Sequence, residues 1–172
     1  MSLEDLSAED FVHFVDPRLR FCRNLQSYNS QSSRIYQVER DGVLYVLKAA
    51  GFIAAKERDA LSETLDVPGI THLVEDYCLV KPFSAIFLKE YAEGSLLKRI
   101  CWSERQLFKS QVMDTVKALH ARQFFNLDIH DENFIVSPDH RRITFIDFLL
   151  FETNTNSAYR SSDLSMVRNQ FP

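Results

Sequence analysis

The chain has 172 residues, of which 45% are hydrophobic and 26% charged, and its formal net charge is −4. This composition is typical of a globular protein with one or two small domains, and the negative charge argues against nonspecific nucleic-acid binding. Three scattered cysteines predict neither a disulfide framework nor a zinc site, but reduced thiols in the cytoplasm. Because the first residues are acidic and no apolar run approaches a membrane span, we expect no signal peptide and no transmembrane segment.

The first half of the chain is predicted to be mostly sheet. Alternating apolar residues on both sides of Asp41-Gly42 indicate a β-hairpin, because Asp-Gly favours the tight turn that such hairpins need. Ser7 and Asp10 have the spacing of a helix-capping pair. The expected elements are a short helix, an ambiguous segment that could be a strand, the hairpin, a second helix and two strands, at residues 7–15, 19–28, 33–50, 53–65, 72–80 and 84–91.

The second half is predicted to be mostly helical. Ser103 is a candidate N-cap for the longest of its helices. The expected elements are two helices, two short strands that flank a turn, and a closing helix, at residues 95–101, 103–122, 134–137, 142–148 and 161–171. The sequence therefore predicts an α+β protein whose two domains, residues 1–91 and 92–172, join near residues 90–94.

Polar residues in the second half form a spaced set. Asp128 and Asn133 share one loop, and Asp147 lies inside the apolar run ITFIDFLLF. A carboxylate there costs free energy unless a cation sits against it, either a side chain such as Arg142 or a metal ion. A hairpin would bring Asn133 close to Asp147, and their oxygens are suitable Mg²⁺ ligands. Asp128 could then accept a proton from an attacking hydroxyl. Taken singly, Asp128 could equally shape a turn and Asn133 could cap an element.

NLDIHDENFIV and ITFIDF resemble two motifs of the protein-kinase-like family, the catalytic loop H-R-D-x-x-x-x-N and the metal motif D-F-G. The corresponding triplets are Asn126-Leu127-Asp128 and Asp147-Phe148-Leu149. The resemblance implies that Asp128 is the catalytic base, that Asn133 and Asp147 bind Mg²⁺, and that ATP is the phosphoryl donor.

The first half contains further segments similar to this family. VLYVLKA resembles the strand whose lysine holds the α- and β-phosphates, which makes Lys48 the candidate. Glu57 is its expected partner, because on a helix Glu57 shares a face with Leu61 and Leu65, whereas Glu63 lies on a charged side. A buried glutamate needs a cation, and Lys48 would supply it.

AIFLKEYAEGSLL resembles the segment that links the lobes and binds the purine through its backbone, so Glu90 would offer a carbonyl and Ala92 an amide. The chain departs from the family at three points. The expected Gly-rich loop is replaced by SYNSQSSRIYQV, and Leu127 and Leu149 replace the motif's arginine and glycine. Few residues follow Leu149, so the helices that dock peptide substrates would be largely absent.

The resemblance therefore implies a minimal bilobal protein-kinase-like fold, with an antiparallel-sheet N-lobe containing one helix and a truncated helical C-lobe. Within this family, the chain resembles the small atypical branch of bacterial lipopolysaccharide-core sugar kinases, of the Kdo and heptose type, and RIO-like kinases. We expect a cytoplasmic phosphotransferase that uses ATP and Mg²⁺ to phosphorylate a hydroxyl group of a sugar or glycolipid. We expect no nucleic-acid partner, and the protein could contact the inner membrane peripherally. The alternatives are a small serine/threonine protein kinase and a pseudokinase that acts as a binding module.

Overall fold

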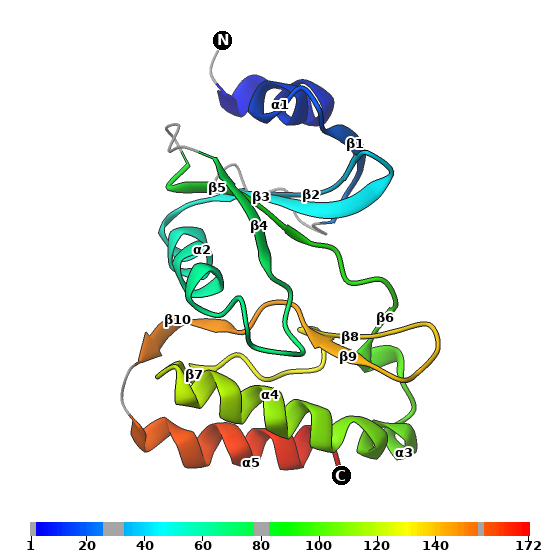
Figure 1. Ribbon diagram of the computed structural model, residues 1–172, viewed down its shortest axis with the longest axis vertical. Coiled ribbons are helices and arrows are strands. Elements are labelled where there is room, and N and C mark those ends of the chain that lie inside the picture. The colour runs from blue at the N-terminus through cyan, green and yellow to red at the C-terminus, as the bar shows by residue number, and fades with distance from the viewer. Residues whose placement is uncertain (1–2, 26–32, 78–82, 155–156) are drawn as a thin grey trace. The chain divides into compact units, whose positions relative to one another are not determined.

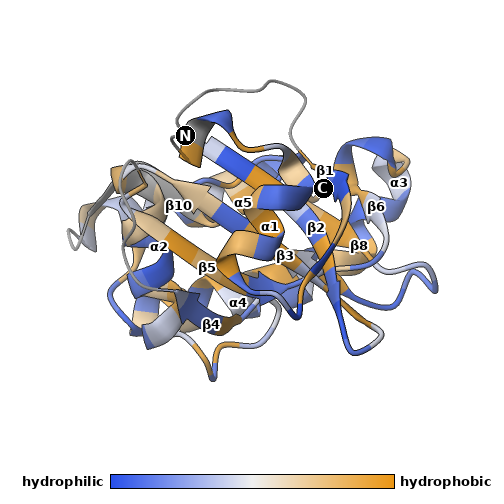
Figure 2. Ribbon diagram, turned by 90° about the horizontal axis from the view of Figure 1, so that it is seen from above, coloured by the Kyte–Doolittle hydropathy of each residue, from blue (hydrophilic) through white to orange (hydrophobic). Residues whose placement is uncertain are grey.

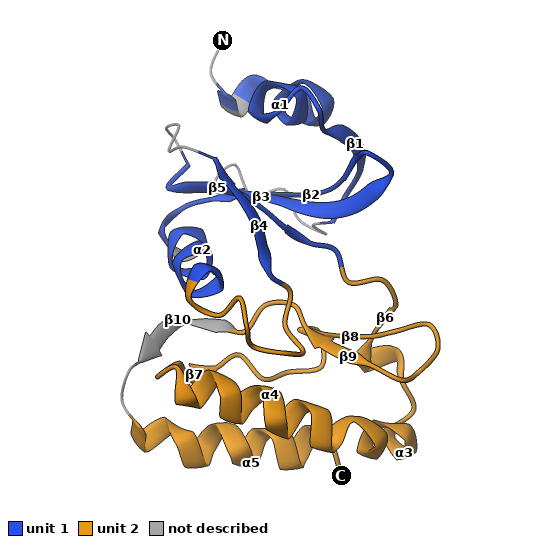
Figure 3. Ribbon diagram, in the orientation of Figure 1, with its two compact units in different colours: residues 1–62, 72–91 blue, residues 63–71, 92–172 orange. Residues whose placement is uncertain are grey.

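The chain forms two units, which Figure 3 colours separately: residues 1–62 with 72–91, and residues 63–71 with 92–172. The structure is a computed structural model that describes residues 3–25, 33–77, 83–154 and 157–172. Sheet is concentrated in unit 1 and helix in unit 2 (Figure 1). The predicted α+β class with an antiparallel sheet is therefore confirmed.

Unit 1 is built on a five-stranded antiparallel sheet with strand order β1-β2-β3-β5-β4. Its strands are β1 (Arg20–Asn24), β2 (Ser33–Arg40), β3 (Val43–Ala50), β4 (Leu73–Tyr77) and β5 (Ala85–Glu90). Its helices are the 3-10 turn η1 (Leu3–Asp5), α1 (Ala8–Val15) and α2 (Phe52–Glu63). The predicted cap of α1 is confirmed, because the Ser7 side chain accepts a hydrogen bond from the Asp10 amide at 3.1 Å.

The hairpin of β2 and β3 turns at Asp41-Gly42, as predicted. Arg40 pairs with Val43, which leaves a two-residue loop. Asp41 has a φ of 54° and Gly42 a φ of 80°. A tight hairpin turn of this kind needs positive φ at both central residues, which explains why Asp-Gly stands there.

The two faces of the sheet in unit 1 carry different kinds of side chain. Register places Lys48 opposite Phe87 and Val46 opposite Lys89, so both lysines project from one face, the face that α2 covers (Figure 1). On the other face, β3 and β5 contribute apolar side chains that pack with α1. Figure 2 colours the hydrophobic residues of these elements orange. That core consists of Phe11, Val12, Leu19, Tyr36, Val38, Leu47, Ala49, Phe83, Ile86 and Leu88. Polar side chains can therefore gather beneath α2 without disturbing the main core.

Unit 2 combines short strands with two helices, α4 and α5, that run side by side (Figure 1). One sheet has the order β6-β8-β9, and a second pairs β7 with β10. The strands are β6 (Ser95–Leu96), β7 (Phe125–Leu127), β8 (Phe134–Val136), β9 (Ile143–Phe145) and β10 (Leu149–Asn154). The helices are η2 (Leu97–Arg99), α3 (Trp102–Arg105), η3 (Gln106–Phe108), α4 (Lys109–Ala121), η4 (Ser157–Tyr159) and α5 (Arg160–Gln170).

Two predictions in unit 2 are wrong. Residues 95–101 do not form a helix, because Ser95 and Leu96 pair with Val136 and Ile135 of β8 and only the short turn η2 follows. Ser103 is not a helix cap, because α3 already begins at Trp102. Strand pairing with a distant segment overrides the local helical pattern here.

Gly94 allows the chain to enter β6. Its φ is 145°, a conformation that side chains rarely adopt, and a Cβ built there would collide with the carbonyl oxygen of Val136. The backbone of the linker can therefore lie directly against β8 only because residue 94 has no side chain.

None of the described helices is long and apolar enough to cross a lipid bilayer.

Candidate functional site

In unit 1, Lys48 of β3 donates a hydrogen bond to the Oε2 atom of Glu57 on α2. Glu57 is 2% exposed, while Glu63, the competing candidate, is exposed at the end of α2. The helical phase noted in the sequence explains this difference, since Glu57 faces the sheet together with Leu61. The predicted pair thus meets beneath the sheet, on the face that α2 covers.

A second lysine shares the same carboxylate. Lys89 of β5 is also buried and donates to the Oε1 atom of Glu57 at 2.6 Å. Burial alone would raise the pKa of Glu57, but the charges of Lys89 and Lys48 outweigh it and lower that pKa from 4.5 to about 2. Glu57 therefore stays ionised with one ammonium group on each oxygen. Lys89 was given no role from the sequence.

The predicted purine-binding groups lie around the end of β5. Glu90 is the last residue of that strand, and its amide donates to the carbonyl of His72 at 3.0 Å. Its carboxylate accepts from the His72 amide at 3.1 Å. Ala92 lies in the following loop. The roles of both backbones stay predictions. The first half of the predicted phosphate-covering segment, residues 27–32, lies outside the described residues.

In unit 2, the loop between β7 and β8 brings Asp128 and Asn133 together. The side-chain amide of Asn133 donates to the Asp128 carboxylate at 2.9 Å and to the Asp128 carbonyl at 3.0 Å. With its nitrogen on Asp128, the Asn133 side chain presents its oxygen as the atom that can bind a cation.

His130 contacts the same carboxylate. Its Nδ1 atom accepts from the Glu132 amide at 3.3 Å, so in the neutral imidazole the proton resides on Nε2. Nε2 lies 3.3 Å from the Oδ2 atom of Asp128, the oxygen that Asn133 also binds. That contact is an ion pair when the imidazole is protonated. Because the Asn133 amide donates to Oδ2, Oδ1 is the carboxylate oxygen that could accept a substrate proton.

Asp147 stands between two residues whose backbones are tied to this loop. The Ile146 amide donates to the Asn133 carbonyl at 2.8 Å, and the Phe148 carbonyl accepts from the Asp128 amide at 3.1 Å. The first contact continues the β8–β9 hairpin, in which Phe134 pairs with Phe145. Asp128, Asn133 and Asp147 therefore belong to one set of bonded loops.

Arg142 is not placed to neutralise Asp147. It lies at the turn end of β9, where its amide donates to the Ser137 hydroxyl at 3.0 Å, while Asp147 follows the other end of that strand. Five residues of extended chain span roughly 16 Å. This separation argues against Arg142 as the side-chain partner of Asp147.

The oxygens of Asn133 and Asp147 fit a hard divalent cation. Among the residues that the structure describes, no group of three or more histidine, cysteine, aspartate or glutamate side chains could hold a metal ion. One carboxylate and one amide oxygen suit Mg²⁺, which usually keeps several waters and completes its coordination with phosphate oxygens. The donor set fits a metal that arrives with a nucleotide better than a permanent structural ion.

The neighbouring acids Asp131 and Glu132 are tied to the segment before α4. Arg105 pairs with Asp131 at 3.1 Å and Lys98 with Glu132 at 2.7 Å. The Lys98 amide also donates to the Asp131 carbonyl at 3.1 Å. These two acids therefore hold the loop in place from outside.

Asp163 of α5 fixes the backbone that leads to Asp128, a role that was not predicted from the sequence. It is 0% exposed and accepts from the amides of Asn126 and Leu127, each at 3.1 Å. Its Oδ2 atom also lies 2.8 Å from Nε2 of His120. One sequence feature could have indicated it: Asp163 is four residues before the buried Val167, so it shares the apolar stripe of its helix.

Comparison with known proteins finds similarity in structure and none in sequence. No protein-family model matches the chain, and no curated protein matches it in sequence. Among solved structures, 1722 chains match. One is the kinase PK-1 of Cydia pomonella granulovirus, with a TM-score of 0.62, 14% identity, and coverage of 76% of this chain and 53% of the viral chain. The chain thus spans about half the length of that kinase, and it has a protein-kinase-like fold.

Proposed function

We propose that the chain is an ATP-dependent phosphotransferase that moves the γ-phosphoryl group of ATP to an alcohol. The observation that carries this proposal is the bonded set of Asp128, Asn133 and Asp147 within a protein-kinase-like fold. In that set, a carboxylate suited to proton transfer lies beside oxygens suited to Mg²⁺.

Asp128 is assigned the role of the base that deprotonates the acceptor hydroxyl. Its Oδ2 atom accepts a hydrogen bond from Asn133 and lies 3.3 Å from His130, and Oδ1 takes the proton of the acceptor hydroxyl. The acceptor oxygen forms a bond to the γ-phosphorus, the bond to the β–γ bridging oxygen breaks, and ADP leaves with that electron pair. Asn133 and Asp147 would hold Mg²⁺, which neutralises charge on the phosphate oxygens. Little covalent chemistry is then left to the protein beyond positioning.

Lys48 is assigned the role of binding the α- and β-phosphates of the nucleotide. Its pairing with the buried Glu57 restricts the ammonium group to one region of the sheet face. A fixed cation stabilises phosphate charge without reorganising during the reaction.

A sugar or glycolipid hydroxyl is the proposed acceptor. This choice rests on the resemblance of the motif NLDIHDENFIV to the lipopolysaccharide-core sugar kinases, since no family model and no curated protein matches the chain in sequence. His130, two residues after the proposed base, is part of that similarity and contacts Asp128. Such an enzyme would work in the cytoplasm and meet glycolipid acceptors at a membrane surface.

The first test is calorimetric titration of ATP, with and without Mg²⁺, into the wild-type protein and Asp147→Asn. Binding should require Mg²⁺ and weaken about tenfold or more in the variant, because a metal ligand loses its charge. Asp139→Asn, a change in the exposed β8–β9 turn, should bind as the wild type does. If ATP binds under none of these conditions, the chain is a binding module and the proposal is wrong.

The second test follows labelled γ-phosphate into candidate acceptors. Asp128→Asn should still bind ATP but lose about 10²-fold or more in transfer rate, because the proton acceptor is gone. Label in core sugars or glycolipid supports the proposed acceptor class. Label in proteins alone would replace it with a protein kinase.

A further inference from the structure

Trp102 is the only tryptophan of the chain, and it lies on the surface of unit 2. It is the first residue of α3, and 53% of its surface is exposed. Among the side chains that the structure describes after residue 91, only Leu107 is another large hydrophobic group with comparable exposure. Single exposed hydrophobic residues are common in proteins, so the exposure of Trp102 alone assigns it no role.

A buried arginine holds the ring of Trp102. The guanidinium carbon of Arg105 lies 5.3 Å from the ring centroid, within the range of a cation–π contact. Arg105 is 7% exposed, and its guanidinium also donates to the Ile100 carbonyl at 3.4 Å and to the Asp131 carboxylate at 3.1 Å. Because these contacts restrict the arginine, the indole ring on top of it has little conformational entropy to lose when it binds a ligand.

Arg105 connects the Trp102 ring to the loop that contains the proposed base. Asp131, which Arg105 binds, follows Asp128 by three residues in the loop between β7 and β8. The Asp131 carbonyl also accepts from the amide of Lys98 at 3.1 Å, so this part of the loop lies against the segment that leads into α3. A ligand that stacks on Trp102 would therefore lie beside the loop from which Asp128 acts.

The groups around Trp102 are polar. Ser103 and Glu104, the next two residues of α3, are both exposed. Lys98 and Glu132, which are also exposed, form an ion pair at 2.7 Å next to Asp131. Hydrogen-bond donors and acceptors thus surround a single aromatic ring.

Leu107 does not extend this aromatic surface. Leu107 precedes Gln111 by one helical turn, so the two share a face. The Gln111 side-chain amide donates to the Arg141 carbonyl at 3.0 Å, which places that face against the β8–β9 turn. Trp102 is instead directed by Arg105 toward the loop between β7 and β8. A protein partner or a lipid bilayer would need a broader apolar surface than one ring with a polar border.

A sugar ring matches this combination of groups. One face of a pyranose is formed by C–H groups that pack on an aromatic ring, and its hydroxyl groups need hydrogen-bond partners around the edge. We infer that Trp102 binds the acceptor: a sugar ring of the acceptor stacks on the indole beside the loop that contains Asp128. The acceptor role in this inference rests on the proposed function.

The first measurement uses Trp102 as the only tryptophan fluorophore of the chain. The protein is titrated, without nucleotide, with the deacylated core oligosaccharide of a bacterial lipopolysaccharide. We expect a saturable change in tryptophan fluorescence, because a sugar ring replaces water on the indole. Vesicles of phosphatidylglycerol or phosphatidylcholine should leave the spectrum unchanged. Since no nucleotide is present, this result does not depend on phosphoryl transfer.

The second measurement determines the kinetic constants for transfer from ATP to the same oligosaccharide. Trp102→Ala should raise the acceptor KM about tenfold, because the stacking contact is lost, and should leave kcat and the KM for ATP within about twofold. Trp102→Tyr should keep the acceptor KM within about threefold of the wild type, because an aromatic face remains.

Leu107→Ala is the matched control, since it removes the other exposed hydrophobic side chain of the same segment. It should leave both KM values within about twofold of the wild type. A purely structural Trp102 predicts instead that Trp102→Ala lowers thermal stability without separating the acceptor KM from the KM for ATP. Thermal melts identify any variant that has lost its fold.

The outcomes that would overturn the inference are distinguishable from a failure of the proposed function. If the oligosaccharide leaves the fluorescence unchanged, or if Trp102→Ala keeps the acceptor KM of the wild type, Trp102 does not bind the acceptor, while measured transfer keeps the proposed function. A blue shift with vesicles alone would assign the surface to a lipid bilayer. If the oligosaccharide titration saturates but the wild type does not bind ATP, the proposed function and the acceptor role fall, and sugar binding by Trp102 stands.

Discussion

Among the described residues, Glu57 of unit 1 and Asp163 of unit 2 are the most deeply buried acidic side chains, with 2% and 0% exposed. The two carboxylates are stabilised by different kinds of partner. Glu57 of unit 1 is neutralised by two lysine side chains. Asp163 of unit 2 is bound by two backbone amides and by His120. Both carboxylates use both oxygens, so neither is left with a wholly unpaired atom.

The partners of the two carboxylates differ in how freely they can move when a ligand binds. Lysine side chains have several rotatable bonds, so they can transfer part of their contact to an incoming anion. Backbone amides cannot move without moving the chain. Glu57 therefore suits a cluster that exchanges partners with a ligand, whereas Asp163 suits a loop that must keep one shape.

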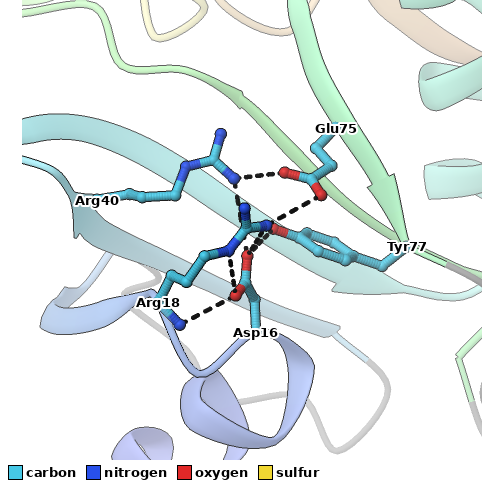
Figure 4. A network of polar contacts seen from close by, with 5 residues as sticks. All are labelled: Asp16, Arg18, Arg40, Glu75 and Tyr77. Atoms are coloured by element: carbon cyan, nitrogen blue, oxygen red, sulfur yellow. Dashed lines mark hydrogen bonds and ion pairs between the residues drawn. The ribbon is translucent and has the colours of Figure 1, made fainter.

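Asp16 is an intermediate case at the edge of the sheet of unit 1 (Figure 4). It accepts from the backbone amide of Arg18 at 3.0 Å, from the Arg18 guanidinium at 2.8 Å and from the Tyr77 hydroxyl at 3.0 Å. Arg40 and Glu75 extend the network. The hydrogen bond from the Arg18 side chain is the main reason that the pKa of Asp16 lies far below its usual value.

The largest effect is expected for Asp163→Ala. Removal of this side chain leaves two buried amides and one imidazole without their acceptor, which should cost about 3 kcal/mol or more of unfolding free energy. Urea denaturation measures it, with the exposed Asp139→Ala as control. A loss similar to that of the control would mean that backbone contacts of this kind do not hold the loop.

A smaller loss is expected for Glu57→Gln, about 2 kcal/mol near pH 7, because the amide keeps the shape of the side chain but not its charge. The pH dependence is more specific. The pKa of Glu57 is lowered from 4.5 to about 2 in the folded protein. Its stabilising contribution is therefore complete above about pH 4.5 and disappears as the pH falls to about 2.

The stability difference between the wild type and Glu57→Gln should accordingly shrink across that acidic window. Denaturant titrations at a series of pH values would measure it. A difference that stays constant down to about pH 2 would mean that the two lysines do not hold Glu57 in its charged form.

The substitution His120→Phe tests how much the imidazole contributes to the stabilisation of Asp163. The new ring can keep the contact with Phe125, whose ring centroid lies 5.0 Å from that of His120. The Oδ2 atom of Asp163 loses one donor but retains the Asn126 amide. We expect a loss of about 1 to 1.5 kcal/mol in urea denaturation. A loss as large as that of Asp163→Ala would place most of the effect in the imidazole and little in the amides.

The smallest effect is expected for Tyr77→Phe, which removes one of several donors to Asp16. Burial is the main reason that the pKa of the Tyr77 hydroxyl is raised, and its hydrogen bond to Asp16 adds to this. The loss should be about 0.5 to 1 kcal/mol in thermal or urea unfolding. Tyr91→Phe removes an exposed contact with Arg23 and should change stability by less. Equal effects would show that Asp16 does not depend on Tyr77.

Local features of the fold were predictable from the sequence. The Asp41-Gly42 turn, the Ser7 cap and the helix that presents Glu57 depend on residues only a few positions apart. The helical periodicity around Glu57 was sufficient to prefer it to Glu63 as the residue that faces the sheet.

Features that depend on distant residues were not predictable in this way. β6 is a strand because β8 lies beside it, about forty residues further along the chain. Lys89 and Asp163 act on partners on other elements, 32 and 36 positions away. A strand that contains one lysine, or a polar helix that contains one aspartate, gives no indication of where its charge is used. The candidate loop was found only because its members follow a recognisable spacing.

Gly94 has a consequence for how this chain can change over generations. A base change at either of the first two positions of a glycine codon introduces a side chain or ends translation, and at residue 94 a side chain would strike the backbone of Val136. Silent changes at the third codon position are then the only substitutions that selection should pass there. Its exposed neighbour Glu93 does not have this constraint. A library of random variants, sorted for folded protein, should therefore diversify at residue 93 while returning glycine at residue 94.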